Sequence, residues 1–397
     1  MPKKPLKIIT QKVKVFRRNN PIISILMWGI NYSMSELSQA TIPAVLLPEY
    51  FKAYLKVKVE NCGFNKDKLP SNYKFKEYFP MVFRDLRERF NIDDEDYCTS
   101  MTKYDPQATK DMGRSGSKLY RSYDLKYFVK TISKDEVSVL HKFIPHYHHY
   151  LVKNQCETLL CKYVGLYRIT VNQGETYILV QKSCFPPIYP IHKKYDLKGS
   201  TVSRQATTKE RKKELPTLKD NDFMNELTYI DVDVESREIL LEKLKSDVEF
   251  LRMQSVMDYS LIIGVHDLDA VINSDVENDE ECQYPTMTNS ESDRMSKITQ
   301  KSTDSDDNVD LVNVYEADQV IIEAVNIESI ASDNNRGTSA NHIYIVGIID
   351  FNTTYGMKKR TAHSAKTLKH GADAEISTVN PDQYAKRFIN FISKSIR

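Results

Sequence analysis

The sequence predicts an α+β fold, because segments with strand periodicity and segments with helical periodicity are mixed along a chain of 397 residues. Residues 166–183 have the pattern of a β-hairpin, with Asn, Gln and Gly at the turn. Residues 234–256 carry apolar side chains three and four positions apart, with charged residues opposite, as an amphipathic helix does. Two more strand-like runs have an acid at one end: Asp258 precedes the first and Asp350 ends the second.

Local signals justify the other elements in chain order. Asn20-Pro21 and Asn380-Pro381 each mark a helix start, because asparagine caps a helix and proline suits its first position. Between these two helices the periodicity predicts four further features: a strand at 54–59, a helix at 79–90, a strand–turn–strand unit at 110–132 and a helix at 141–160.

Composition limits the classes of protein. An apolar content of 41% is enough for a sizeable core, and a formal net charge of +2 means that any basic surface must arise from segregation of charge. The six cysteines contain no CxxC pair, which indicates free thiols in a reducing compartment. The longest apolar run, residues 21–30, is half of the ~20 residues that span a bilayer, and no cleavage site follows it. We expect a soluble, cytosolic protein.

The two acids are candidates for phosphoryl transfer. In such sites one acid commonly contacts the attacking hydroxyl and another holds Mg²⁺. Asp258 and Asp350 suit these two roles, although an acid at a strand end is also typical of a solvated cap. Lys130 follows an apolar pair in strand alternation, where a lysine ordinarily lies at an edge or extends to solvent. Gly113 and Gly116 would let backbone N–H groups approach phosphates, but an ordinary hairpin has the same composition.

Three long motifs resemble the phosphatidylinositol phosphate kinases: YDLKGSTVSR at 195–204, LPTLKDNDF at 215–223 and MDYSLIIGVHD at 257–267. The segment 362–388, AHSAKTLKHGADAEISTVNPDQYAKRF, resembles the type II subfamily, the phosphatidylinositol 5-phosphate 4-kinases. The resemblance covers the chain from about residue 12 onward. It implies a two-lobed lipid-kinase fold, distantly similar to protein kinases, with an antiparallel sheet in each lobe and the nucleotide between the lobes.

The resemblance also implies how the chain is divided. The parts are an N-terminal tail and helix at 1–30, an N-lobe with dimerisation elements and the phosphate-binding turn at 31–182, and a C-lobe with the catalytic acids at 183–397. Residues 268–340 would be an insertion in the C-lobe. Their acidic, Ser/Thr-rich part cannot bury enough apolar surface to offset the entropy of ordering, so we expect disorder. Residues 351–379 would form the substrate-selecting loop.

The motif matches assign roles to individual residues by resemblance. The catalytic residues would be Asp258, which orients or deprotonates the lipid hydroxyl, together with Lys130 and Lys198. Asp350 would bind the metal. The expected nucleotide-binding residues are Gly113, Gly116, Lys130, Lys182, Ser183, Cys184, Lys194 and Asp350. The expected substrate-binding residues are Arg204, Lys358, Lys359, Arg360 and Ala362.

These roles imply transfer of the ATP γ-phosphate, with Mg²⁺, to the 4-hydroxyl of phosphatidylinositol 5-phosphate, which gives the 4,5-bisphosphate. Ala362 favours this reaction over the rival one, that of a phosphatidylinositol 4-phosphate 5-kinase, where glutamate is typical at that place. Ser183 stands where type II kinases usually carry asparagine, so GTP is less favoured than ATP as donor. A second rival is a low-activity, membrane-binding dimeric scaffold of the same family, which the unusual residues 351–353 keep open.

The expected partners follow from the same resemblance. They are a phosphoinositide lipid, an anionic membrane surface and a second copy of the chain or a relative, without nucleic acid. The basic residues between 358 and 370 suit an anionic bilayer, at ~1 kcal/mol for each residue near the surface, although a basic run is usually a solvated face. The expected location is the cytoplasm, at the cytosolic face of membranes, and the nucleus is compatible as well.

Overall fold

The computed structural model describes residues 20–41, 43–60, 70, 72–109, 116–226, 229–268, 321–323, 342–355 and 379–397. Several predicted features lie outside these residues. They are Gly113, the substrate-binding set Lys358, Lys359, Arg360 and Ala362, and most of the ranges 268–340 and 351–379. Their predicted roles stay predictions.

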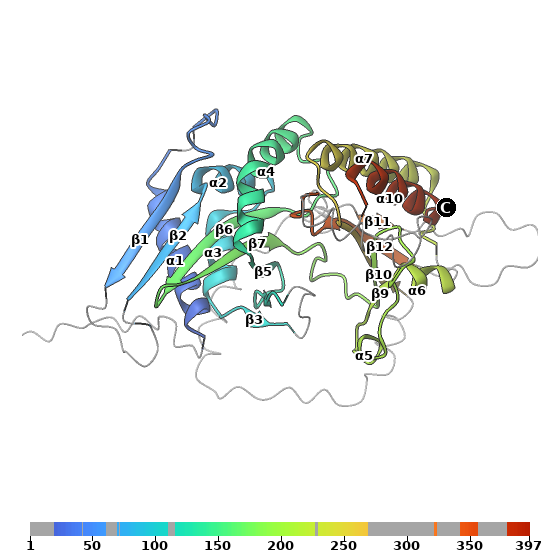
Figure 1. The fold of residues 1–397 in the computed structure, drawn as a ribbon, viewed down its shortest axis with the longest axis horizontal. Helices are drawn as coiled ribbons and strands as arrows, with labels where there is room; N and C mark the ends of the chain where they lie inside the picture. The colour runs from blue at the N-terminus through green and yellow to red at the C-terminus, as the bar shows by residue number, and fades with distance from the viewer. Residues whose placement is uncertain are drawn as a thin grey trace, which may run out of the picture.

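An antiparallel sheet forms the first lobe (Figure 1). Its strands are, in spatial order, β1 (Tyr54–Glu60), β2 (Asn72–Tyr78), β6 (Tyr163–Val171), β7 (Gly174–Lys182), β5 (Tyr127–Ile132), β4 (Leu119–Arg121) and β3 (Gln107–Ala108). The predicted hairpin at 166–183 is confirmed as β6 and β7. Its turn residues Asn172 and Gln173 both have positive φ, 47° and 67°, which matches the twist of the flanking strands.

Four helices pack around this sheet: α1 (Pro21–Ser38), α2 (Pro80–Arg89), α3 (Asp94–Thr102) and α4 (Lys134–Lys153). Asn20 caps α1 by accepting a hydrogen bond from the Ile22 N–H at 3.1 Å. A side chain at Gly29 would lie 2.1 Å from the Phe75 ring of β2, so glycine permits the close approach of α1 to the sheet. Helix α1 runs continuously across residue 30 and packs against β2 and β6.

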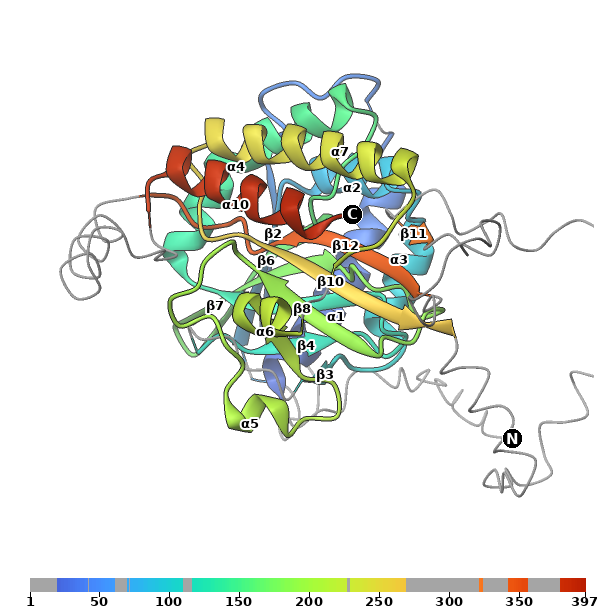
Figure 2. The same cartoon turned by 90° about the vertical axis from the view of Figure 1, so that its right-hand side faces the viewer.

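A second sheet forms the other lobe, with its strands in the order β11 (Ile321–Glu323), β12 (His342–Ile349), β10 (Ser260–Asp267), β8 (Lys193–Leu197) and β9 (Thr217–Lys219). The pairs are antiparallel except β8 with β9, which are parallel. The other helices within the described residues are α5 (Thr208–Arg211), α6 (Asp220–Asn225), α7 (Val234–Met253) and α10 (Pro381–Ser395). Figure 2 shows α7 and α10 side by side above this sheet. The predicted α+β fold is confirmed, with one parallel pair added.

The two lobes are joined through main-chain contacts as well as through the chain itself. Leu160 forms a parallel bridge with Ile348 of β12, and the Cys161 N–H donates to the Ile348 carbonyl at 2.9 Å. The buried carboxylate of Asp247, on α7, accepts the Leu159 N–H at 2.6 Å. It also accepts the hydroxyls of Tyr150 and Thr158. This carboxylate therefore fixes the segment that connects α4 and β6 to the C-lobe.

Asp247 makes the free energy of unfolding depend on pH. Burial raises the pKa of its carboxyl from 3.8 to about 6, although its hydrogen bonds act in the opposite direction. Between these values the folded chain holds a proton that the unfolded chain has released, so stability falls as the pH rises through this window and is level above it. We expect the difference in unfolding free energy between the wild type and Asp247→Asn, measured in urea, to follow this course. A difference that is constant with pH would contradict it.

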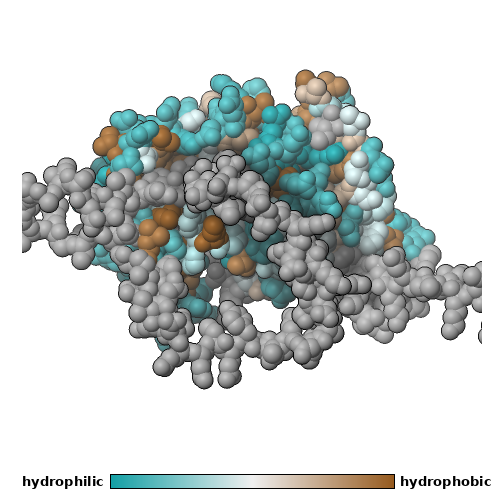
Figure 3. Space-filling model, turned by 180° about the vertical axis from the view of Figure 1, so that it is seen from behind, coloured by the Kyte–Doolittle hydropathy of each residue, from teal (hydrophilic) through white to brown (hydrophobic). Residues whose placement is uncertain are grey.

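The surface of the described part is mainly hydrophilic on the face opposite to Figure 1, with hydrophobic residues in small separate groups (Figure 3). Within the described ranges, every helix is too short or too polar to cross a bilayer.

Candidate active site

The two predicted acids lie at the same end of the C-lobe sheet. Ser260 at the start of β10 is paired with Ile349 at the end of β12, so Asp258 precedes one strand where Asp350 follows the other. Pairing resumes beyond them, where the Met257 N–H donates to the Thr353 carbonyl at 3.0 Å. Both acids have left-handed backbones, with φ of 70° and 62°. Such strained conformations persist only where the surroundings impose them, and they gather at functional sites.

Each acid has a lysine beside it. The Lys130 Nζ, from β5 of the N-lobe, lies 2.7 Å from the Asp350 Oδ1. The Lys198 Nζ, directly after β8, donates to the Asp258 carbonyl at 2.5 Å and lies 3.3 Å from its Oδ1. Burial lowers the pKa of the Lys130 ammonium, but the Asp350 carboxylate more than offsets this effect, so the pKa is raised and the lysine stays charged. The structure thus forms two acid–lysine pairs, with both acids at the same end of the C-lobe sheet, and the members of the first pair are 220 positions apart.

Gly116 is the one of the two predicted glycines that the structure describes. Gly116 has φ of 73°, and a Cβ added there would meet nothing within 4 Å, so its backbone is open to a ligand. Three residues later, Leu119 of β4 pairs with Lys130 of β5. The described residues from Gly116 onward therefore lead into the strand that pairs with Lys130.

The linker between the lobes packs closely against two glycines of the C-lobe sheet. A Cβ on Gly347 of β12 would lie 2.8 Å from the Cys184 Sγ, and one on Gly264 of β10 would lie 2.7 Å from the Phe185 ring. Lys182 ends β7, and the Ser183 N–H donates to the Lys126 carbonyl at 2.7 Å. The described cysteines are free thiols, as predicted.

The Ser183 side chain is used within the linker. Its hydroxyl donates to the Phe185 carbonyl at 3.0 Å and accepts the Phe185 N–H at 3.2 Å. The residue is buried, so the hydroxyl closes a turn. Next to it, a hydrogen bond with Cys184, together with burial, raises the pKa of the Cys161 thiol, which keeps this thiol neutral.

Lys194 lies near the start of β8, and Lys198 directly follows its end. Alternate residues of a strand share a face, so Lys194 and Asp196 point the same way. Four residues of strand separate the two lysines by ~13 Å. Lys194 is paired with Gly264, against which the linker packs, whereas Lys198 contacts Asp258.

Arg204 lies beneath this face and is engaged by two carboxylates. Its Nε is 2.6 Å from the Asp220 Oδ2, and its Nη2 is 2.9 Å from the Asp196 Oδ1. The side chains of Arg204 and Asp220 are 4% and 0% exposed. Burial alone would raise the pKa of the Asp196 carboxyl. The positive charges of Arg204, Lys219 and Lys198 lower it by more than burial raises it, so the pKa is below its usual range. Arg204, which the sequence predicts to bind the lipid headgroup, is therefore a buried cation that pairs with two acids of the C-lobe.

Sequence reasoning missed Lys219, whose Nζ lies 3.6 Å from the Asp196 Oδ2. The available signal was its place in the motif 215–223 together with the acids that surround it. A charge that neutralises a buried acid and a charge on a solvated face look alike in the sequence, which explains the omission.

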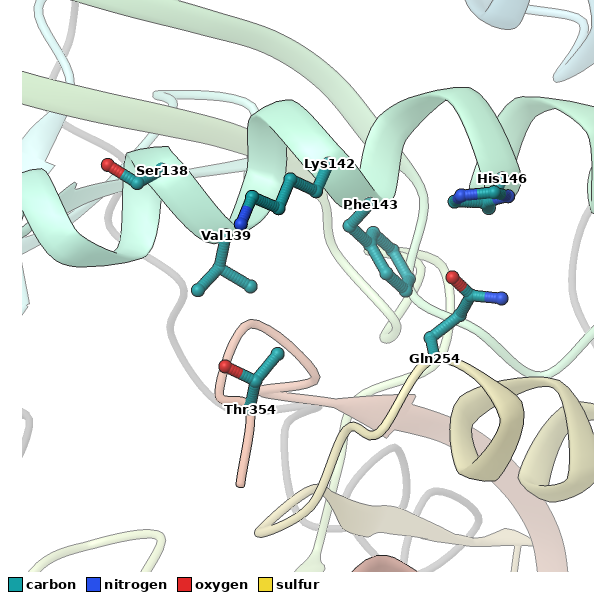
Figure 4. Close-up of a pocket in the computed structure, with 7 residues that line it drawn as sticks. All are labelled: Ser138, Val139, Lys142, Phe143, His146, Gln254 and Thr354. Carbon is teal, nitrogen blue, oxygen red and sulfur yellow. The ribbon is translucent and has the colours of Figure 1, made fainter. Parts of the chain in front are cut away.

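A cavity of about 300 Å³ lies beside the site (Figure 4). Five of its lining residues come from α4, and they face Gln254, which follows α7, and Thr354, which follows β12. The α4 residues are Ser138, Val139, Lys142, Phe143 and His146. The cavity therefore separates one side of α4 from the C-lobe, close to the segment that begins at Asp350.

Two sheets that meet at paired acids and lysines define a kinase-like class of protein. The chain belongs to the phosphatidylinositol phosphate kinase family, since the family model described as "Phosphatidylinositol-4-phosphate 5-Kinase" matches residues 100–395. It is 45% identical over 385 residues to "Phosphatidylinositol 5-phosphate 4-kinase type-2 alpha" of Gallus gallus, which covers 97% of this chain and 94% of the relative. It is 44% identical over 390 residues to the type-2 beta protein of Homo sapiens, with 97% and 92% covered. The predicted family is confirmed.

Proposed function

We propose that this protein transfers the γ-phosphate of ATP to the 4-hydroxyl of phosphatidylinositol 5-phosphate and so forms the 4,5-bisphosphate. The observation that carries the proposal is the meeting of Asp258, Asp350, Lys130 and Lys198 where the two lobes join. Relatives that match nearly the whole chain are named phosphatidylinositol 5-phosphate 4-kinases, which supports the choice of lipid.

Each side chain has a distinct part in this proposal. Asp258 accepts the proton of the attacking hydroxyl, and Lys198, bonded to it, keeps the carboxylate oriented. Lys130 binds the phosphates of the nucleotide, which are also approached by the backbone at Gly116. The new bond to the lipid oxygen replaces the bond between the γ- and β-phosphates, and negative charge moves onto the departing ADP. The protein charges are in place before this step, so little reorganisation is needed.

Asp350 fits the requirement of Mg²⁺. This ion usually keeps several waters and takes one or two carboxylates in addition to substrate phosphates. The Asp350 side chain is 49% exposed and stands at the junction of the lobes, so it can serve as such a carboxylate. When bound, Mg²⁺ supplies charge neutralisation on the phosphate oxygens.

ATP is the proposed donor. The Ser183 hydroxyl is bonded to the Phe185 backbone and its N–H to Lys126, so neither group is presented to a guanine edge. Adenine needs only main-chain partners from the linker, which the substitution of asparagine by serine does not remove.

Dimerisation and membrane contact are part of the proposal. Strand β1 is at the edge of the N-lobe sheet, and an edge strand presents main-chain groups that a second copy can pair with. On the sheet face opposite α1, Lys56 lies across from Lys76 and Lys58 across from Lys74. At ~1 kcal/mol each near an anionic surface, these lysines would hold the enzyme on the cytosolic side of a membrane.

The test is a radiolabelled ATP assay on each of the three phosphatidylinositol monophosphates in mixed vesicles. The proposal expects transfer to the 5-phosphate lipid above the other two. Transfer chiefly to the 4-phosphate lipid would support the 5-kinase instead. Transfer to none of them, with vesicle binding retained, would support the scaffold.

Substitution Ala362→Glu is expected to shift preference toward the 4-phosphate lipid. A glutamate there adds a negative charge to a cluster of basic residues and so changes how a ring phosphate is held. The measurement is the ratio of kcat/KM for the two lipids, with Ala362→Gln as the uncharged control of similar size. An unchanged ratio would mean that this loop does not select the substrate.

A further inference from the structure

Asn352 makes a part-buried contact between the two lobes. Its Nδ2 donates to the Glu136 Oε1 at 2.7 Å, and the residue is 4% exposed. Glu136 lies in the first turn of α4, and its other oxygen, Oε2, accepts the Ser133 N–H at 2.7 Å. Both carboxylate oxygens of Glu136 are therefore engaged, one by the cap of its own helix and one by the C-lobe.

This contact is next to the metal acid. Asn352 follows Asp350 by two residues, and Glu136 follows Lys130 by six, across the junction of β5 and α4. Two bonds thus link the same two segments: Lys130 with Asp350, and Glu136 with Asn352. In protein kinases the corresponding lysine pairs with a glutamate of the following helix. Here the glutamate is held by Asn352, and the lysine by Asp350.

The two bonds respond differently to nucleotide binding. Both Lys130 and Asp350 are needed by the nucleotide and its metal, so their mutual ion pair must loosen when these bind. Neither Asn352 nor Glu136 has such a role, and the Asn352 side of their part-buried bond is shielded from water, since that residue is 4% exposed. It can therefore persist and hold β5 and α4 in register with the segment of Asp350 throughout the cycle.

We propose that Asn352 is a positioning residue of the kinase: through Glu136 it sets the distance between Lys130 and Asp350 in the nucleotide-bound enzyme. The inference rests on the proposed kinase function. Asn352 itself touches neither the nucleotide nor the lipid, so its influence reaches ATP use and leaves lipid recognition alone.

The test exchanges the donor and the acceptor. Asn352→Asp places two carboxylates against each other, and we expect kcat/KM for ATP to fall about 10-fold or more, because a hydrogen bond to a charged group is lost. Glu136→Gln in the same chain restores the bond, since its amide donates to the new carboxylate while its oxygen accepts the Ser133 N–H, as glutamine does in a capping box. The double variant is expected within about 3-fold of wild type.

The readouts separate positioning from folding. The unfolding midpoint without nucleotide should fall in Asn352→Asp, because two carboxylates then face each other, and should return in the double variant. The KM for lipid should stay at the wild-type value, and the ATP-induced rise of each variant's own midpoint should shrink in Asn352→Asp and return in the double variant. Asn31→Asp, an exposed asparagine on α1, is the matched control for added charge. Wild-type ATP use in Asn352→Asp, or no recovery in the double variant, would overturn the inference. A wild type that binds ATP but phosphorylates no lipid would sink the proposed function alone, since the midpoint shift still tests Asn352.

Discussion

Asp350→Asn is expected to lower kinase activity at least ~100-fold, because it removes a charge that acts where negative charge develops. The fold should be kept. Asparagine tolerates the left-handed backbone at this position, where φ is 62°. The ion pair with Lys130 is half exposed on the aspartate side, and pairs of this kind contribute about 0–1 kcal/mol to stability.

Single-turnover transfer of labelled phosphate measures the first quantity, and urea unfolding measures the second. Asp382→Asn is the matched control, because Asp382 is an exposed acid paired with Arg252 on the surface. Full turnover by Asp350→Asn would remove the metal assignment.

Arg204→Met is expected to cost about 3–5 kcal/mol of unfolding free energy, because it leaves two acids without their shared cation. Asp220 is 0% exposed, so water cannot replace the guanidinium there. The carbonyl of Asp196, which also accepts a hydrogen bond from Arg204, loses its donor. The measurement is urea unfolding, with Arg252→Met as control. Arg252 makes only exposed pairs with Glu249 and Asp382, so its loss should change stability by about 0–1 kcal/mol.

The same variant separates two roles of Arg204. The sequence suggested contact with the lipid headgroup, whereas the structure engages the side chain with Asp196 and Asp220. Wild-type stability combined with a raised KM for lipid would return Arg204 to the surface of the substrate site and contradict the buried role.

The spacing of apolar residues was sufficient to predict helices, because the contacts that define a helix are local in the sequence. The stripe Leu240, Leu244, Val248 and Leu251 predicted α7, and all four side chains are buried. Likewise Asn380-Pro381 marks the start of α10, whose Tyr384 and Phe388 pack against the Tyr259 ring. These patterns are set by neighbours one turn away, so one sequence contains them in full.

Contacts between distant segments could not be found in that way. The partner of Lys130 is 220 positions away, and nothing in the spacing of either residue points to the other. Only the resemblance to a family suggested that they meet. The bond between Asn352 and Glu136 was not foreseen at all, because an asparagine after a strand ordinarily signals a turn.

The main-chain bridge between Leu160 and Ile348 has a consequence for how the chain can be divided. If the gene were divided at the linker, Cys161 and Ile348 would lie in different fragments. The Cys161 N–H would then lack its acceptor, and the Ile348 carbonyl would lack its donor. Buried main-chain groups tolerate such loss poorly. The two halves are thus one cooperative folding unit, and neither would make a sound expression fragment by itself.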